Sequence, residues 1–251
     1  MRTIAFALGL ILSMSGLAAA QELSTYKNIE DGFEAIFPST PTVKTTTWKS
    51  QYDYDLPAHV YTVDRGGEHY SVTVVDYTGI EKLAQERVKT CPPGAPLCRG
   101  TELGGFGLWK HDVRGAAEWA MLQILKRDTK LTDMTWSQHD LVMGTELQMA
   151  NPDRSRTYAY IAMHENRLYA LEATMPRTSP PATLFQTSLE FLDKDGNAIR
   201  YSTMYINALH GMRVYPPPTR AGGAAAAPAA GGGRGGRAGG GGGGRAGGGG
   251  Q

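Results

Sequence analysis

Residues 70–77 read YSVTVVDY, and this stretch decides the fold. It holds three valines and two tyrosines, and β-branched and aromatic side chains are enriched in strands. Gly66 and Gly67 precede it as a turn signal, and the run from Val60 to Val63 lies just before that turn. The pattern therefore predicts two antiparallel strands that are joined near residues 66–67.

The flanking segments extend the pattern in both directions. Residues 33–37 alternate Phe, Ala and Phe with other side chains before Pro38, and residues 43–48 are rich in β-branched residues. After the strand, Thr78 and Glu81 have the spacing of a helix capping box. The apolar residues that follow share one helical face: Ile80, Leu83, Ala84 and Val88.

The second half repeats the order of helix and strands. Residues 115–127 (GAAEWAMLQILKR) predict a helix that is apolar on nearly all sides and therefore well buried. A last helix is expected from about Pro181 to Leu189, with Ser179 as its cap and an inward face of Leu184, Phe185 and Leu189. Four strands are expected between these helices, at residues 131–136, 145–149, 157–164 and 168–174. The fold class we predict is α+β, an antiparallel sheet flanked by helices.

Both ends of the chain differ from this body. Residues 1–20 combine an early Arg2, a short apolar run and a small-residue motif, so we predict a signal peptide cleaved between Ala20 and Gln21. Residues 221–251 consist of 17 Gly, 9 Ala, 3 Arg, one Pro and one Gln. Such a segment has almost no apolar area to bury, so we expect a disordered tail. The remaining residues, 21–220, form one predicted globular domain without a further transmembrane segment.

Charge is divided unevenly between these parts. All 24 acidic residues lie in the domain, whereas five of the 25 basic residues lie in the signal peptide, at Arg220 or in the tail. The domain is therefore mildly acidic, which argues against specific binding of nucleic acid by the folded part. Taken with the signal peptide, the composition predicts a periplasmic or secreted protein.

The two cysteines lie close together in a proline-rich segment, CPPGAPLC, at Cys91 and Cys98. In an exported protein such a pair is expected to form a disulfide. The spacing differs from the CxxC motif of thiol oxidoreductases, so we expect a structural bridge rather than a redox site.

Motifs for catalysis, cofactors and metals are missing from the sequence. No two of the six histidines are three or four residues apart, and neither HExxH nor GxSxG occurs in the domain. Residues 104–107 (GGFG) do not continue into a phosphate-binding motif and are expected to form a flexible connection. Histidines are expected in turns or at the surface, and the scattered methionines in the core. We predict no catalytic, cofactor-binding or metal-binding residue.

Several phrases of the sequence resemble a known group of proteins. GFEAIFPSTPTV (32–43), HVYTVDRGGEHYSVTVVDY (59–77), ENRLYALEATMP (165–176) and LFQTSLEFL (184–192) are similar to uncharacterised secreted bacterial proteins with a PsbP-like α/β/α sandwich. The resemblance covers roughly residues 33–201. It implies a binding or accessory role, as is common for that fold, and it supplies no catalytic residue.

Three functional hypotheses remain open from the sequence. The leading one is a non-enzymatic extracytoplasmic module that binds an envelope protein or a small ligand. The alternative is a small secreted hydrolase or ligand-processing enzyme with dispersed active residues, which a deep pocket with convergent polar groups would favour. In the third, the cationic tail tethers the protein to anionic envelope polymers.

Overall fold

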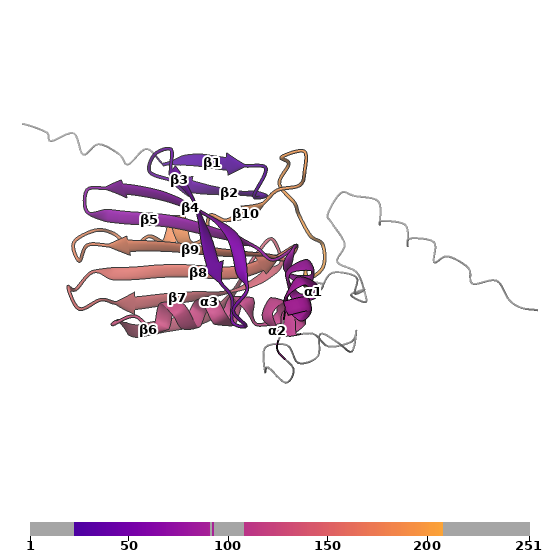
Figure 1. Ribbon diagram of the computed structural model, residues 1–251. Coiled ribbons are helices and arrows are strands. Elements are labelled where there is room, and N and C mark those ends of the chain that lie inside the picture. Colours follow the sequence, from indigo (N-terminus) through magenta and orange to yellow (C-terminus); the bar gives the residue numbers. More distant parts are fainter. Residues whose placement is uncertain (1–22, 91, 93–107, 208–251) are drawn as a thin grey trace, which may run out of the picture.

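A seven-stranded antiparallel sheet forms the body of the molecule in a computed structural model that describes residues 23–90, 92 and 108–207 (Figure 1). Its strand order is β3-β4-β5-β9-β8-β7-β6. The strands are β3 (Thr42–Lys49), β4 (Asp55–Arg65), β5 (Glu68–Asp76), β6 (Lys130–His139), β7 (Val142–Ala150), β8 (Arg156–His164) and β9 (Arg167–Met175). The antiparallel α+β class predicted from the sequence is confirmed.

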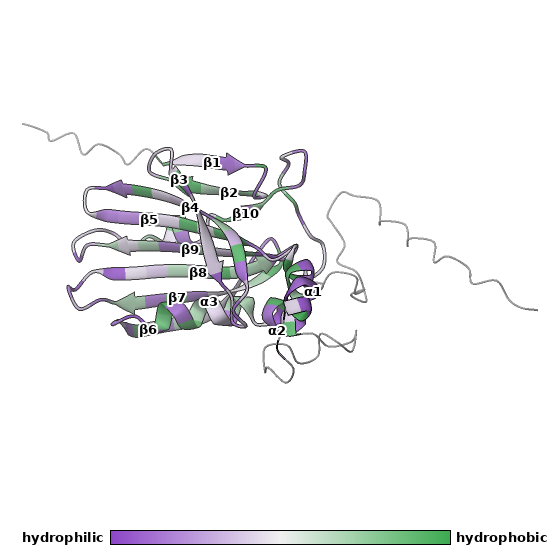
Figure 2. Cartoon of the chain, viewed as in Figure 1, coloured by the Kyte–Doolittle hydropathy of each residue, from purple (hydrophilic) through white to green (hydrophobic). Residues whose placement is uncertain are grey.

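The central strands are buried on both faces. In β5, Tyr70, Val72 and Val74 belong to one core cluster, whereas Val75 belongs to the other. Side chains alternate between the faces of a strand, so a run such as YSVTVVDY supplies both clusters at once. Hydrophobic and hydrophilic residues accordingly follow one another in short stretches along the strands (Figure 2).

Three helices cover one face of the sheet. They are α1 (Ile80–Thr90), α2 (Leu108–Arg114) and α3 (Ala116–Leu125). α3 packs across β8 and β9, and its buried residues Ala116, Ala120 and Ile124 are small or branched. Their short side chains allow the helix to lie close to the sheet.

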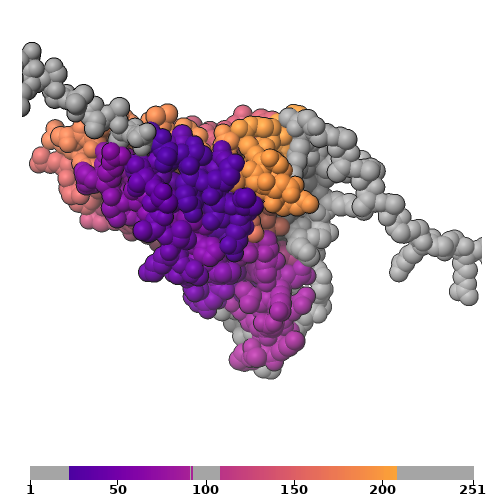
Figure 3. Space-filling model, turned by 90° about the horizontal axis from the view of Figure 1, so that it is seen from above, coloured from indigo at the N-terminus to yellow at the C-terminus, as the bar shows by residue number. Residues whose placement is uncertain are grey.

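The opposite face is covered by a small sheet and one helical turn. The small sheet has the order β1-β2-β10, with β1 (Ser24–Asn28), β2 (Phe33–Phe37) and β10 (Glu190–Phe191), and α4 (Thr183–Gln186) lies beside it. Phe33 and Phe37 of β2 are fully buried, which confirms the alternation predicted for residues 33–37. Figure 3 shows the segment near residue 200 packed against the N-terminal strands.

Two helical predictions are corrected by the structure. The segment 115–127 forms α3, but Leu122 remains 45% exposed, so only one side of the helix is buried. The last helix is a single turn, α4, which begins after Ala182 without a side-chain cap, so Ser179 does not cap it. Leu184 points away from the core with 65% exposure, whereas Phe185 and Leu189 are buried as predicted.

The histidine and methionine predictions are also only partly right. His164 is 2% exposed and stacks on Phe191, with Nε2 2.9 Å from the hydroxyl of Tyr201. Met149 and Met175 lie in the core, but Met134 and Met143 are 48% and 41% exposed. Sequence spacing could not show this difference, because it depends on how the strands, helices and small sheet pack against one another.

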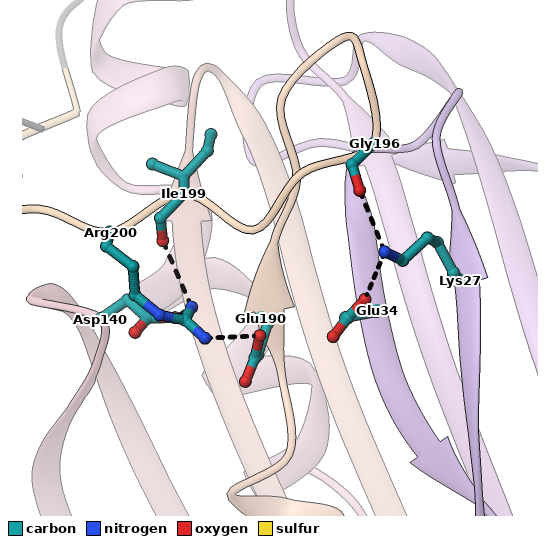
Figure 4. Close-up of polar contacts among 7 residues, drawn as sticks. All are labelled: Lys27, Glu34, Asp140, Glu190, Gly196, Ile199 and Arg200. Atoms are coloured by element: carbon teal, nitrogen blue, oxygen red, sulfur yellow. Dashed lines mark hydrogen bonds and ion pairs between the residues drawn. The ribbon is translucent and has the colours of Figure 1, made fainter. Parts of the chain in front are cut away.

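Ion pairs connect the chain segments on the small-sheet side (Figure 4). Arg200 donates to Asp140 at 2.7 Å and to Glu190 at 2.8 Å, so it links the β6–β7 turn to β10. Lys27 pairs with Glu34 at 3.0 Å and donates to the carbonyl oxygen of Gly196 at 3.0 Å. Exposed pairs of this kind contribute little to stability, so their main effect is to position the segments.

Candidate functional site

β6 lies at one end of the seven-stranded sheet, and among the described strands it pairs only with β7. Eight of its ten residues are exposed. An edge strand presents a row of unpaired backbone groups, and proteins usually shorten, charge or cover such an edge. β6 is long, contains no proline, and carries few charges along its length.

The turn between β6 and β7 determines which backbone groups face the open edge. Asp140 and Leu141 have positive φ angles of 50° and 64°, as in a two-residue type I′ turn. The closing pair of this turn, His139 and Val142, is therefore hydrogen-bonded, and hydrogen-bonded residues alternate along an antiparallel ladder. The residues whose N–H and C=O groups point to the open edge are the intervening ones: Met134, Trp136 and Gln138.

The strand register places the side chains of these residues on the helix-covered face. Met134 lies opposite Leu147 in β7, and Leu147 belongs to the core beneath the helices. Trp136 lies opposite Thr145, which is opposite Ile161 of the same core. Cross-strand partners share a face, so Met134 and Trp136 lie on the face that α3 partly covers.

A groove of about 490 Å³ separates α3 from this exposed edge. We call it the apolar groove. Its lining consists of Ala117, Glu118 and Met121 from α3, Met134 and Trp136 from β6, Met143, Gly144 and Thr145 from β7, and Ile161 from β8. Its volume falls within the range of ordinary ligand sites.

The chemistry of the apolar groove favours non-covalent binding. Trp136 is 76% exposed, the largest exposure among the large hydrophobic side chains of the described residues. Methionine side chains adapt to different shapes, and tryptophan supplies much contact area in binding sites. Glu118 is the one titratable residue of the lining, so the groove offers apolar contact rather than acid–base chemistry.

A smaller polar pocket of about 210 Å³ lies on the opposite face of the sheet. Its charged or titratable lining residues are Glu30, Asp31, His59, Asp76 and Arg167. His59 Nδ1 lies 2.8 Å from Asp31 Oδ2, and the Tyr61 hydroxyl donates to the same oxygen at 2.5 Å. Burial raises the pKa of Tyr61, and the hydrogen bond to Asp31 raises it further. Tyr61 therefore remains a hydrogen-bond donor at neutral pH.

This polar pocket has part of the geometry of a catalytic site. A carboxylate that holds a histidine in place is a common arrangement for a general base. Serine, cysteine and threonine are absent from the described lining, so the pocket does not bring a nucleophile beside His59. The sequence did not predict this convergence, because Asp31, His59 and Arg167 come from a turn and two separate strands.

Asp112 is a further buried acid, and its neighbours give it a structural role. It is fully buried in α2 and accepts hydrogen bonds from the Ser50 hydroxyl and from the backbone N–H groups of Gln51 and Tyr52 at 3.1 and 3.3 Å. Burial raises its pKa, against the hydrogen bonds that lower it. Asp112 therefore fastens the β3–β4 turn to the helices.

The structure does not describe the residues that were singled out in the sequence. Cys91 and Cys98, the predicted disulfide, and Ala20 and Gln21, the predicted cleavage site, all fall outside the described residues. Within the described ranges, no three His, Cys, Asp or Glu side chains gather closely enough to hold a metal ion. No helix among the described residues is long and apolar enough to cross a membrane.

Comparison with known proteins yields a structural neighbour. No protein-family model matches the chain, and no curated protein matches it. The solution structure of cyanobacterial PsbP (CyanoP) from Synechocystis sp. PCC 6803 is similar to it. The two are 16% identical, with a TM-score of 0.38, over 72% of this chain and 98% of that chain. At these values the match carries no argument about function, and the α+β class rests on the strands and helices described above.

Proposed function

We propose that this chain is a non-enzymatic, extracytoplasmic binding module that holds an apolar segment of a partner protein in the apolar groove. The exposed row of Met134, Trp136 and Met143 beside α3 carries the proposal. Contiguous exposed apolar surface of this kind marks interaction sites in soluble proteins. The extracytoplasmic location rests on the predicted signal peptide and stays part of the proposal.

Removal of the Trp136 ring tests this proposal. Trp136→Ser leaves the core intact, because the side chain is largely exposed. A tryptophan at the centre of an interface contributes about 2 kcal/mol or more, which corresponds to a roughly 30-fold weaker complex. We therefore expect a protein captured from periplasm by the wild-type chain to be lost from captures by Trp136→Ser, as measured by quantitative mass spectrometry.

Leu184→Ser supplies the matched control, since Leu184 is 65% exposed on α4, on the other face of the sheet. It should capture the same protein in the same amount as the wild type. Equal capture by all three chains would show that the apolar groove is not the binding surface. Loss of capture in both variants would have the same meaning.

The polar pocket supports a second candidate, a ligand-processing enzyme in which Asp31 orients His59 as a general base. The 2.8 Å contact between these residues favours it. Chromogenic ester and phosphoester substrates test it directly. Turnover by the wild-type chain that is lost in His59→Gln would support the enzyme, whereas turnover that survives the substitution would remove His59 from the mechanism.

A further inference from the structure

We propose that two copies of this chain pair antiparallel through the open edges of their β6 strands, which joins their two apolar grooves across a two-fold axis. The second copy is the occupant of the edge, whereas the partner protein of the proposed function occupies the groove beside it. The pairing therefore rests on the proposed function only through the side chains of Met134 and Trp136, which both proposals use. The backbone edge and Thr135, which is not part of the groove lining, belong to the pairing alone.

Backbone geometry selects the register of this pairing. Met134 and Trp136 direct their N–H and C=O groups to the open edge, as the turn after β6 establishes. A two-fold axis at Thr135 places Met134 of each copy opposite Trp136 of the other, which gives two equivalent pairs. Both members of each pair then exchange backbone hydrogen bonds, as the antiparallel ladder requires.

The same register brings apolar side chains together. Trp136 and Met134 lie on the helix-covered face in each copy and are 76% and 48% exposed in the single chain. In the pair, the indole ring of Trp136 in one copy covers the thioether of Met134 in the other. Contact between sulfur and an aromatic ring is favourable. The pairing therefore extends each groove with residues from the second copy.

Charge is complementary in this register as well. β6 begins at Lys130, and Asp140 follows its last residue. Beyond the regularly paired residues of an antiparallel pair with its axis at Thr135, the start of β6 in each copy approaches the β6–β7 turn of the other, and with it Lys130 approaches Asp140. Asp140 binds Arg200 through Oδ2, and within the described residues its Oδ1 forms no hydrogen bond. This oxygen can accept from the lysine of the second copy.

A β-bulge limits the length of the paired segment. The register of β6 against β7 shifts between Leu131 and Asp133, so regular pairing with a second copy covers residues 133–137. A short paired segment gives a dimer of modest affinity that depends on protein concentration. The dimer should therefore be sought at high micromolar concentration.

Thr135→Cys in the full chain tests the register most sharply. Thr135 lies on the axis and bonds to β7, so the two copies of residue 135 form a non-hydrogen-bonded pair with Cα atoms about 4.5 Å apart, within disulfide range. We expect dissolved oxygen to oxidise the two thiols to a disulfide, which gives a linked dimer on a non-reducing gel. The parent chain, with Cys91 and Cys98, gives the background.

Ser137→Cys is the matched control, because the two copies of residue 137 would lie four residues apart along the strands, roughly 13 Å. It should cross-link no more than the parent. Light scattering of the parent should give a mass that rises from one chain toward two as the concentration approaches about 100 µM. Thr135→Lys, which opposes two like charges, should return it to the monomer. A monomeric parent, or equal cross-linking at 135 and 137, would overturn the pairing. Thr135→Lys leaves the groove lining unchanged, so its capture of the partner protein separates failure of the pairing from failure of the proposed function.

Discussion

Gly144→Ala should destabilise the protein by about 2–3 kcal/mol, as expected when a well-packed core is overfilled. A Cβ at this position would lie 2.4 Å from Cζ and 2.5 Å from Cε2 of Tyr160. The ring cannot move aside easily, because it is fully buried, stacks on His139 at 3.9 Å, and donates from its hydroxyl to Val142 at 3.2 Å. Thermal unfolding should show a melting temperature lower by about 4–12 °C.

Gly79→Ala is the control for this substitution. A Cβ there meets no atom within 4 Å, and the residue precedes α1 without a positive φ. Its melting temperature should remain within about 2 °C of the wild type, since the free-energy change is expected to stay below about 0.5 kcal/mol. Equal stability of Gly144→Ala and the wild type would mean that Tyr160 does not pack over β7 as described.

Asp112→Ala should reduce the free energy of unfolding by about 3 kcal/mol. The substitution removes the acceptor of the Ser50 hydroxyl and of two backbone N–H groups, and a buried donor without a partner costs about 1–3 kcal/mol. The β3–β4 turn should then lose its attachment to α2. Denaturant unfolding measures the change, and hydrogen exchange at Gln51 and Tyr52 should become faster.

The pH dependence of Asp112→Asn separates charge from hydrogen bonding. Burial raises the pKa of Asp112 above its ordinary 3.8, so the folded state binds this proton more readily than the unfolded state. Its contribution to stability therefore falls as the pH rises from 3.8 through the raised pKa. The free energy of unfolding of the wild type should exceed that of Asp112→Asn by more at pH 4 than at pH 7. A difference that grows toward pH 7 would contradict the burial of this carboxyl.

Local pattern predicted much of the sheet. The strands at residues 33–37, 70–77 and 157–164 have strong β-branched and aromatic content, and the turn at Glu165–Asn166 adopts the positive φ angles expected for a tight hairpin. These features depend on neighbours along the chain, so they are visible in the sequence.

Elements that depend on distant partners were missed. Among the described strands, β1 and β10 are short and pair only with β2, and β10 meets it from more than 150 residues away. α2 was not predicted, because its sequence LWKHDVR places Asp112 on the side that becomes buried. The burial of Asp112 can be explained only when its hydrogen-bond donors are known, which are the Ser50 hydroxyl and the two backbone N–H groups that follow it.

The candidate sites were missed for a related reason. Met134 and Trp136 lie in a predicted strand, but the sequence does not reveal that this strand is the last in the sheet. Asp31 and His59 are 28 residues apart and meet because the β1–β2 turn folds over β4. Exposure of a strand and contact between turns are properties of topology, which periodicity does not encode.

Photo-crosslinking from position 136 tests the central claim most directly. A photo-activatable phenylalanine analogue replaces Trp136 in the full chain, and the same analogue replaces Leu184 in a control chain. After illumination of intact cells, the account predicts an adduct between position 136 and a protein other than this chain, and none from position 184. Adducts of equal intensity from both positions, or from position 184 alone, would contradict the assignment of the apolar groove as the binding surface.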